Sequence, residues 1–117
     1  MATDFRSGKE FPRRGRDEAS GFLWLLRVYD KARAAANGTI HDYIYPCPMD
    51  RGVFERWGIS SQQFDTAIAA NPTDDAILVW VRERVGDAQR TAANQWLTEE
   101  KSASLDRQDS EEGVIAA

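Results

Sequence analysis

The residues best suited to chemistry lie in the segment YIYPCPMD, residues 43–50, which contains the only cysteine of the chain, Cys47. The only histidine, His41, stands two positions before this segment. A cysteine becomes a nucleophile when a histidine, a cation or a helix N-terminus stabilises its thiolate. His41 could do this for Cys47, and so could a helix expected to begin near Asp50, with Asp50 as its N-cap or as a charge in its first turn. The alternative, which the flanking prolines favour, is a small buried cysteine in a stiff connector.

The same segment gives little support to metal or cofactor chemistry. His41, Cys47 and Asp50 do not have the spacing of a zinc site. The sequence also has no glycine-rich phosphate loop, no G-x-S-x-G motif and no CxxC motif. We therefore predict neither a metal site nor a cofactor. Tyr43 and Tyr45 could line a ligand pocket, although tyrosines beside prolines are more often packing residues.

The helix expected before this segment carries four charged residues close together, Arg27, Asp30, Lys31 and Arg33. Helical spacing puts Arg33 inside the apolar stripe and Asp30 at its edge. An arginine is seldom buried without a partner, so we predict a partly buried Asp30–Arg33 pair, or Arg33 reaching the carbonyls of the connector and Asp50. Arg27 and Lys31 fall on the flank of the stripe. These cations could hold the connector in place, or they could bind a ligand carboxylate or phosphate.

Apolar residues at helical spacing predict five helices, which would position these side chains. They are expected over residues 17–36, 49–57, 60–70, 73–85 and 87–103. A capping box is expected at Ser60 and an N-cap at Thr73. Between the first two helices, residues 39–48 would form an extended connector, because Pro46 and Pro48 exclude a central strand.

The expected fold is all-α, a single compact domain of five helices and one extended proline-rich connector. Residues 17–103 would form this helical domain. Residues 1–16 carry five basic and two acidic side chains, a net charge of +3, and are expected to form a mobile basic arm. Residues 104–117 are acidic and polar, which predicts a disordered tail.

Composition narrows the expected partners and location. The formal net charge of −4 argues against nucleic acid and against an anionic membrane surface as partners. No apolar stretch is long enough to span a bilayer, and the N-terminal residues do not have the apolar core of a secretory signal. A cytoplasmic location is therefore expected.

The first helix and the connector together carry a longer pattern, Leu-x-Arg-x-x-Asp-Lys-x-Arg-Ala, then Gly, then Tyr-x-x-Pro-Cys-Pro-x-Asp, then a Gly-Ile turn. Its positions here are Leu25, Arg27, Asp30, Lys31, Arg33, Ala34, Gly38, Tyr43 or Tyr45, Cys47, Asp50, Gly58 and Ile59. With this pattern, the chain resembles over residues 17–97 a family of small bacterial proteins known only as a domain of unknown function. Leu26 and Leu97 depart from the pattern of that family. The resemblance implies that the helix charges and the connector form one unit, and it implies no activity.

The sequence leaves three functions open. The first is a binding or accessory module with a polar-lined cleft for a small anionic ligand or a segment of a protein partner. The second is a small cofactor-independent enzyme that uses Cys47, Asp50 and Arg33 in the same cleft. The third is a structural subunit, such as a homodimer joined through exposed Trp24 and Trp80. The candidate ligand-binding residues are Arg27, Asp30, Lys31, Arg33, His41, Tyr43, Tyr45, Cys47 and Asp50.

Overall fold

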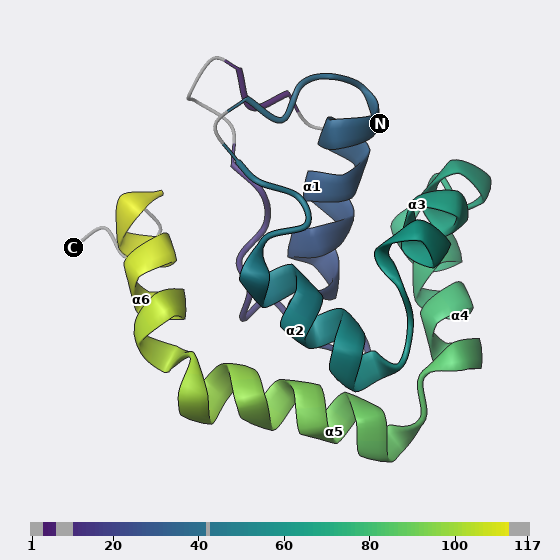
Figure 1. The fold of residues 1–117 in the computed structure, drawn as a ribbon, viewed down its shortest axis with the longest axis vertical. Helices are drawn as coiled ribbons and strands as arrows, with labels where there is room; N and C mark the ends of the chain where they lie inside the picture. The colour runs from purple at the N-terminus through teal and green to yellow at the C-terminus, as the bar shows by residue number, and fades with distance from the viewer. Residues whose placement is uncertain (1–3, 7–10, 42, 113–117) are drawn as a thin grey trace.

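The computed structural model describes residues 4–6, 11–41 and 43–112, and these residues form six α-helices with no strand among them (Figure 1). The helices are α1 (Leu25–Ala36), α2 (Pro48–Trp57), α3 (Ser61–Ala70), α4 (Asp74–Arg84), α5 (Asp87–Gln95) and α6 (Ser102–Glu111). A π-helical turn, Trp96–Glu100, joins α5 to α6. The predicted all-α class is confirmed, but the predicted fifth helix is interrupted by this turn and a sixth helix follows it.

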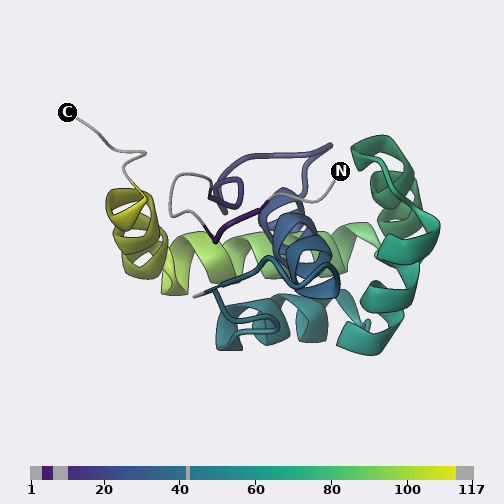
Figure 2. The same cartoon turned by 90° about the horizontal axis from the view of Figure 1, so that it is seen from above.

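The helices form one globule with α1 and α2 near its centre. In Figure 1, α4, α5 and α6 follow a U-shaped course around α1 and α2, and α3 lies beside α4. The view from above places α6 at one end of the molecule and α3 with α4 at the other (Figure 2). Along the middle, α2 packs on α5 and α1 packs on α3. Among the described residues, no helix has the length and apolar character needed to cross a membrane.

Aromatic side chains fill much of the core. Phe54 of α2 packs against Phe64 of α3 with ring centroids 5.1 Å apart, and Phe22 meets Trp57 edge-on at 5.8 Å. Trp24, predicted as an exposed interface residue, is instead fully buried. Because each buried ring removes a large apolar area from water, these contacts hold α2 against α3 and against the segment that precedes α1.

Side-chain caps fix where three of the described helices begin. Ser60 accepts a hydrogen bond from the Gln63 N–H, and the Gln63 side chain accepts one from the Ser60 N–H, which confirms the predicted capping box of α3. Thr73 caps α4, as predicted. Of the two roles expected for Asp50, the charge in the first turn of α2 is the one observed, because Cys47 is the N-cap and Asp50 follows three positions later. The thiol of Cys47 takes the place of the usual hydroxyl or carboxylate.

The first helix is shorter than predicted, because α1 begins at Leu25 rather than at residue 17. The backbone before it turns too sharply for a helix, with positive φ at Gly21 (86°) and at Trp24 (72°). The Asn94 side chain of α5 holds this turn by donating to the Gly21 carbonyl at 2.7 Å. Tertiary hydrogen bonds therefore replace the intrahelical ones that the sequence pattern predicted.

The described part of the N-terminal region packs against the helices. Phe5 is buried, and its N–H donates to the Thr39 carbonyl at 2.9 Å. Gly15 lies so close to Trp24 and Leu105 that a Cβ there would come within 2.6 Å of the first side chain and 2.7 Å of the second. Only glycine fits this position, so the segment around Gly15 is an integral part of the fold.

The other end of the chain also differs from its prediction, because α6 occupies part of the acidic tail expected over residues 104–117. Asp109 of α6 is buried and accepts hydrogen bonds from Arg14 at 2.9 Å and Arg16 at 3.4 Å. The two ends carry opposite charges, and their pairing orders residues that look disordered when each end is considered alone. Among the described residues, part of the predicted tail is thus helical and both ends lie against the helices, while the mobility of the two segments stays a prediction. The rest of both segments, residues 1–3, 7–10 and 113–117, lies outside the described residues.

Candidate functional site

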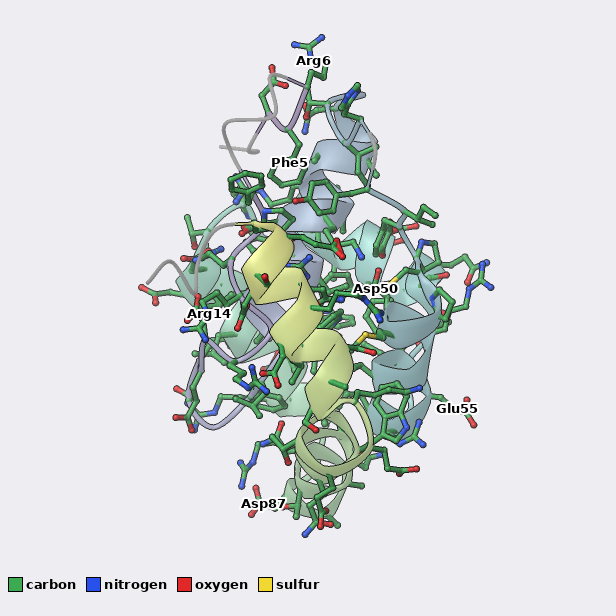
Figure 3. The ribbon with its side chains drawn as sticks, turned by 90° about the vertical axis from the view of Figure 1, so that its left-hand side faces the viewer. Phe5, Arg6, Arg14, Asp50, Glu55 and Asp87 are labelled. Atoms are coloured by element: carbon green, nitrogen blue, oxygen red, sulfur yellow. The ribbon has the colours of Figure 1, made fainter. Side chains whose placement is uncertain are left out.

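A cleft of about 480 Å³ lies between α1, the connector and the C-terminal half of α6. Figure 3 views this side with α6 in front, so that Phe5 lies near the C-terminal end of α6 and Asp50 lies between α6 and α2. The lining residues are Phe5, Phe11, Arg27, Lys31, His41, Tyr43, Ile44, Cys47, Gln108, Glu111 and Glu112. The lining combines cations, aromatic rings and a thiol, which suits a small ligand with both polar and apolar parts.

A buried ion pair lies beside the cleft. Lys31 Nζ is 2.7 Å from Asp50 Oδ2, and the two side chains are 4% and 0% exposed. Asp50 accepts two further hydrogen bonds, from Trp24 Nε1 at 2.8 Å and from the Cys47 N–H at 2.9 Å. Both carboxylate oxygens are therefore bound, and Asp50 joins α1 to α2 rather than facing a ligand.

Cys47 is half-buried on the cleft wall, at the N-cap of α2. Its Sγ lies 3.3 Å from Lys31 Nζ and accepts a hydrogen bond from the Asp50 N–H at 3.4 Å. The Lys31 ammonium group and the N-terminal end of α2 therefore both lie beside the sulfur. The expected helix N-terminus is thus present beside Cys47, and Lys31 adds a cation that the sequence alone does not place there.

Arg27 is buried and holds a carboxylate in the cleft. Its terminal nitrogens lie 3.0 Å and 2.7 Å from the two carboxylate oxygens of Glu112, the residue that follows α6. The Tyr43 hydroxyl donates a third hydrogen bond to Glu112 Oε2 at 3.0 Å. Arg27 and Tyr43, both predicted site residues, thus form one group that binds an anion.

Burial and the charge of Glu112 set the ionisation of this group. Burial disfavours the Arg27 cation, but the Glu112 carboxylate more than offsets this effect and raises the pKa of Arg27. Burial, the charge of Glu112 and the hydrogen bond to it raise the pKa of Tyr43. At neutral pH, Arg27 is therefore a cation and Tyr43 is a hydrogen-bond donor.

Asp30 and Arg33 lie outside the cleft. Asp30 accepts hydrogen bonds from the backbone N–H of Arg13 at 2.9 Å and from its guanidinium at 2.8 Å. The same guanidinium pairs with Asp74 at 2.6 Å. Arg33 lies over the ring of Tyr29, 4.8 Å from the centroid. The predicted Asp30–Arg33 pair is therefore wrong, because Asp30 finds its partner 17 positions earlier in the chain.

The remaining candidates divide between two sides of the connector. His41 borders the cleft and is exposed. Tyr45 lies on the side of α3, where its hydroxyl donates to Asp65 at 2.7 Å and its ring meets Phe54 edge-on. Burial, and then the contact with Asp65, raise the pKa of Tyr45. Tyr45 therefore has a packing role away from the cleft. The structure brings together Arg27, Lys31, His41, Tyr43 and Cys47.

Six lining residues were not predicted from the sequence, and all except Ile44 come from the two ends of the described chain. They are Phe5, Phe11, Ile44, Gln108, Glu111 and Glu112. A signal for α6 is present in the sequence, because Leu105, Asp109 and Glu112 recur at helical spacing and all three side chains are buried. No comparable signal marks Phe5 or Phe11.

The chemistry available in the cleft is anion recognition and reaction at a thiol. Arg27, Lys31 and Tyr43 supply hydrogen-bond donors, and Cys47 supplies the sulfur. Within the described residues, no group of three or more histidine, cysteine, aspartate or glutamate side chains is arranged to hold a metal ion. The donors suit an anionic group because two of them carry a positive charge.

Comparison with known proteins places the chain in a family. The helix and connector pattern noted in the sequence contributes part of the cleft, since α1 supplies Arg27 and Lys31 and residues 43–47 supply Tyr43 and Cys47. No curated protein matches the chain in sequence. One family model matches residues 9–116, which include the cleft apart from Phe5. The resemblance seen in the sequence is therefore confirmed, and the chain belongs to the family described as domain of unknown function DUF5069.

Proposed function

We propose that the protein binds a small anionic ligand in the cleft between α1, the connector and α6. The observation that carries this proposal is the buried Arg27, which borders the cleft and has its guanidinium fork engaged by a carboxylate. Proteins recognise carboxylates with this bidentate geometry. Lys31 adds a second cation and Tyr43 a neutral donor. The cleft volume of about 480 Å³ suits a small molecule.

A titration followed by NMR tests this proposal. The probes are mandelate, phenyl phosphate and the neutral mandelamide, which share an aromatic ring and differ in charge. We expect the anions to shift the backbone amide resonances of Arg27, Tyr43 and Cys47, because these residues line the cleft. Equal shifts with mandelamide, or no binding of either anion at millimolar concentration, would refute the proposal.

A matched pair of arginine variants on α1 sharpens the test. Arg27→Lys keeps the positive charge but loses the planar fork, so we expect it to weaken binding of the anion by about tenfold or more. Arg33→Lys makes the same change on the same helix at a residue outside the cleft, and we expect no effect on binding. Similar losses in both variants would show that the fork of Arg27 is not the binding group.

Native mass spectrometry of gently purified protein can identify the ligand. A mass above 13.2 kDa per chain reports a co-purified molecule. We expect that molecule to be an anion, and to be lost from Arg27→Lys but retained by Arg33→Lys. A neutral or cationic molecule retained by both variants would contradict the proposal.

A second candidate function, a thiol-dependent enzyme, is favoured by one observation: Cys47 Sγ lies 3.3 Å from Lys31 Nζ on the cleft wall. Arg33 and Asp50, the partners that the sequence suggests, do not face this sulfur from the cleft, so Lys31 takes the role of the stabilising cation. The test is the rate of alkylation of Cys47 by iodoacetamide at neutral pH. Faster reaction in the native chain than in guanidinium favours the enzyme, whereas protection until unfolding excludes Cys47 as its nucleophile.

A further inference from the structure

We propose that the ligand is a small carboxylate with an apolar body, and that it binds by displacing Glu112 from Arg27 and Tyr43. This inference rests on the proposed function and deepens it. It makes the C-terminal end of α6 an internal competitor, because Glu112 occupies the position that the ligand carboxylate would take.

The contacts of Glu112 are those of a bound ligand. Arg27 donates hydrogen bonds to both carboxylate oxygens of Glu112, at 3.0 Å and 2.7 Å, and Tyr43 donates another at 3.0 Å. The side chains of Arg27 and Glu112 are 3% and 6% exposed, so the pair is shielded from water. A monocarboxylate can replace Glu112 charge for charge at this position.

Glu112 is also well placed to leave. It follows the last residue of α6, and its N–H donates to the Gln108 carbonyl at 3.0 Å, so its release disturbs only the final turn. A negative charge at the C-terminal end of a helix is disfavoured by the helix dipole. Glu111 adds a second negative charge beside it. Arg27 and Tyr43 therefore hold Glu112 against the electrostatic preference of its own helix.

Two buried polar atoms on the cleft residues have no hydrogen-bond partner among the described residues while Glu112 is in place. They are Arg27 Nε and Gln108 Oε1, which come from α1 and α6. Buried polar groups are nearly always hydrogen-bonded in folded proteins, so these atoms mark positions that a ligand can satisfy. Arg27 Nε is a hydrogen-bond donor that needs an acceptor, and Gln108 Oε1 is an acceptor that needs a donor. A carboxylate that carries a neighbouring hydroxyl offers both.

The apolar wall of the cleft indicates the rest of the ligand. Large apolar side chains that are exposed among the described residues are Phe11, Ile44 and Val79, and the first two line this cleft. Phe11 is 40% exposed and Ile44 is 68% exposed, so both offer surface that an apolar body can cover. A dianionic phosphate fits less well, because Glu111 would remain beside it after Glu112 had left. The ligand class is therefore a small hydroxy-carboxylate with an aliphatic or aromatic body.

The test compares mandelate affinity in the wild-type chain, in Glu112→Gln and in Glu111→Gln. Glu112→Gln removes the competing charge, so we expect mandelate to bind about tenfold more tightly than in wild type. Glu111→Gln removes the same charge from a neighbouring lining residue that is 67% exposed and paired with Arg107 rather than Arg27, so we expect a clearly smaller gain in mandelate affinity than in Glu112→Gln. The dissociation constants come from NMR titration of the full chain.

A second readout needs no mutation. On addition of mandelate to the wild-type chain, the heteronuclear NOE at Glu112 should fall, because the displaced residue becomes mobile, while that of Leu105 in the first turn of α6 should stay high. An unchanged value at Glu112 with mandelate bound would overturn the displacement.

The outcomes separate the two proposals. Equal mandelate affinity in wild type and Glu112→Gln overturns the displacement but leaves anion binding intact. Tighter binding of phenyl phosphate than of mandelate to Glu112→Gln overturns the carboxylate assignment. Failure of both anions to bind any of the three proteins refutes the proposed function itself.

Discussion

The ammonium nitrogen of Lys31 lies 2.7 Å from a carboxylate oxygen of Asp50, and both side chains are almost fully shielded from solvent. Removing two charges from water is costly, and this pair offsets the cost with further contacts. Trp24 and the Cys47 backbone donate to Asp50, and Lys31 also reaches the Cys47 sulfur. The pair therefore joins α1 to α2 and places the thiol beside the cleft.

Breaking this pair from one side should destabilise the fold strongly. Lys31→Met leaves the Asp50 charge buried without its cation, and we expect a loss of about 3–5 kcal/mol in the free energy of unfolding. The double variant Lys31→Met/Asp50→Leu removes both charges and should lose less than Lys31→Met alone. Urea unfolding measures both values, with exposed Arg51→Met as a control. A double variant less stable than Lys31→Met would contradict this account.

The thiol of Cys47 should be replaceable as a helix cap by a hydroxyl but not by a methyl group. Cys47→Ser keeps an acceptor for the Asp50 N–H at the start of α2, so we expect nearly unchanged stability. Cys47→Ala removes the acceptor and should cost about 0.5–2 kcal/mol. Thermal unfolding followed by circular dichroism distinguishes the two variants. Equal melting temperatures for Ser and Ala would show that the cap contributes nothing.

Gly52 should resist substitution because of the ring of Trp96. A Cβ at Gly52 would overlap that ring, which Arg56 covers with its guanidinium 4.2 Å from the ring centroid. Alanine usually stabilises a helix interior relative to glycine, but the overlap should outweigh this gain and destabilise Gly52→Ala by about 1–3 kcal/mol.

A rescue experiment isolates that cause. In a Trp96→Ala background the overlap is gone, so adding Gly52→Ala should be neutral or stabilising, as helix propensity predicts. Chemical denaturation of the two single variants and the double variant gives the coupling energy. A coupling energy near zero would show that overlap with Trp96 is not the cause of the destabilisation by Gly52→Ala.

The tyrosines should make the protein less stable in strong alkali. Burial raises the pKa of Tyr29, Tyr43 and Tyr45 in the folded chain, and Glu112 and Asp65 raise it further at Tyr43 and Tyr45. Above a pH of about 10 the unfolded chain loses phenol protons that the folded chain keeps. The unfolded state then binds fewer protons, so the free energy of unfolding falls as pH rises. Below that pH the contribution of these tyrosines to stability is fully present.

Phenolate absorbance measures this effect. The native chain should titrate at higher pH than the chain in guanidinium, and Tyr43→Phe should reduce the slope of stability against pH. If all the tyrosines of the folded chain ionised near pH 10, the burial of Tyr43 and Tyr45 would be contradicted.

Features that depend on neighbours in the sequence could be predicted. The caps at Ser60 and Thr73 use an acceptor and an N–H three residues apart, and the helical stripe of α4 follows from local spacing. The charge pattern on the first helix also identified Arg27 and Lys31 as residues of the cleft. Local chemistry therefore predicted helices in the positions of α2 to α5 and about half of the lining residues, but not α6.

Features that depend on distant partners could not be predicted. Asp30 pairs with Arg13 at a separation of 17 residues, and Arg27 meets Glu112 at a separation of 85. A helical wheel shows which face a side chain occupies, but it does not show which distant charge will reach it. The left-handed backbone at Trp24 is likewise set by tertiary contacts, and a bulky aromatic residue gives no local signal for it.

The pairing of Arg14 with Asp109 has a kinetic consequence. It closes a loop between residues 95 positions apart, which costs more chain entropy than any contact within or between neighbouring helices. Helical proteins usually fold fast because their contacts are local. Here α3 and α4 can assemble early, whereas the two ends must meet last. The two ends should also separate first during native-state fluctuations. Amide hydrogens of α6 should then exchange faster than those of α1. Each such opening would expose Arg27 on the cleft wall while the core stays folded.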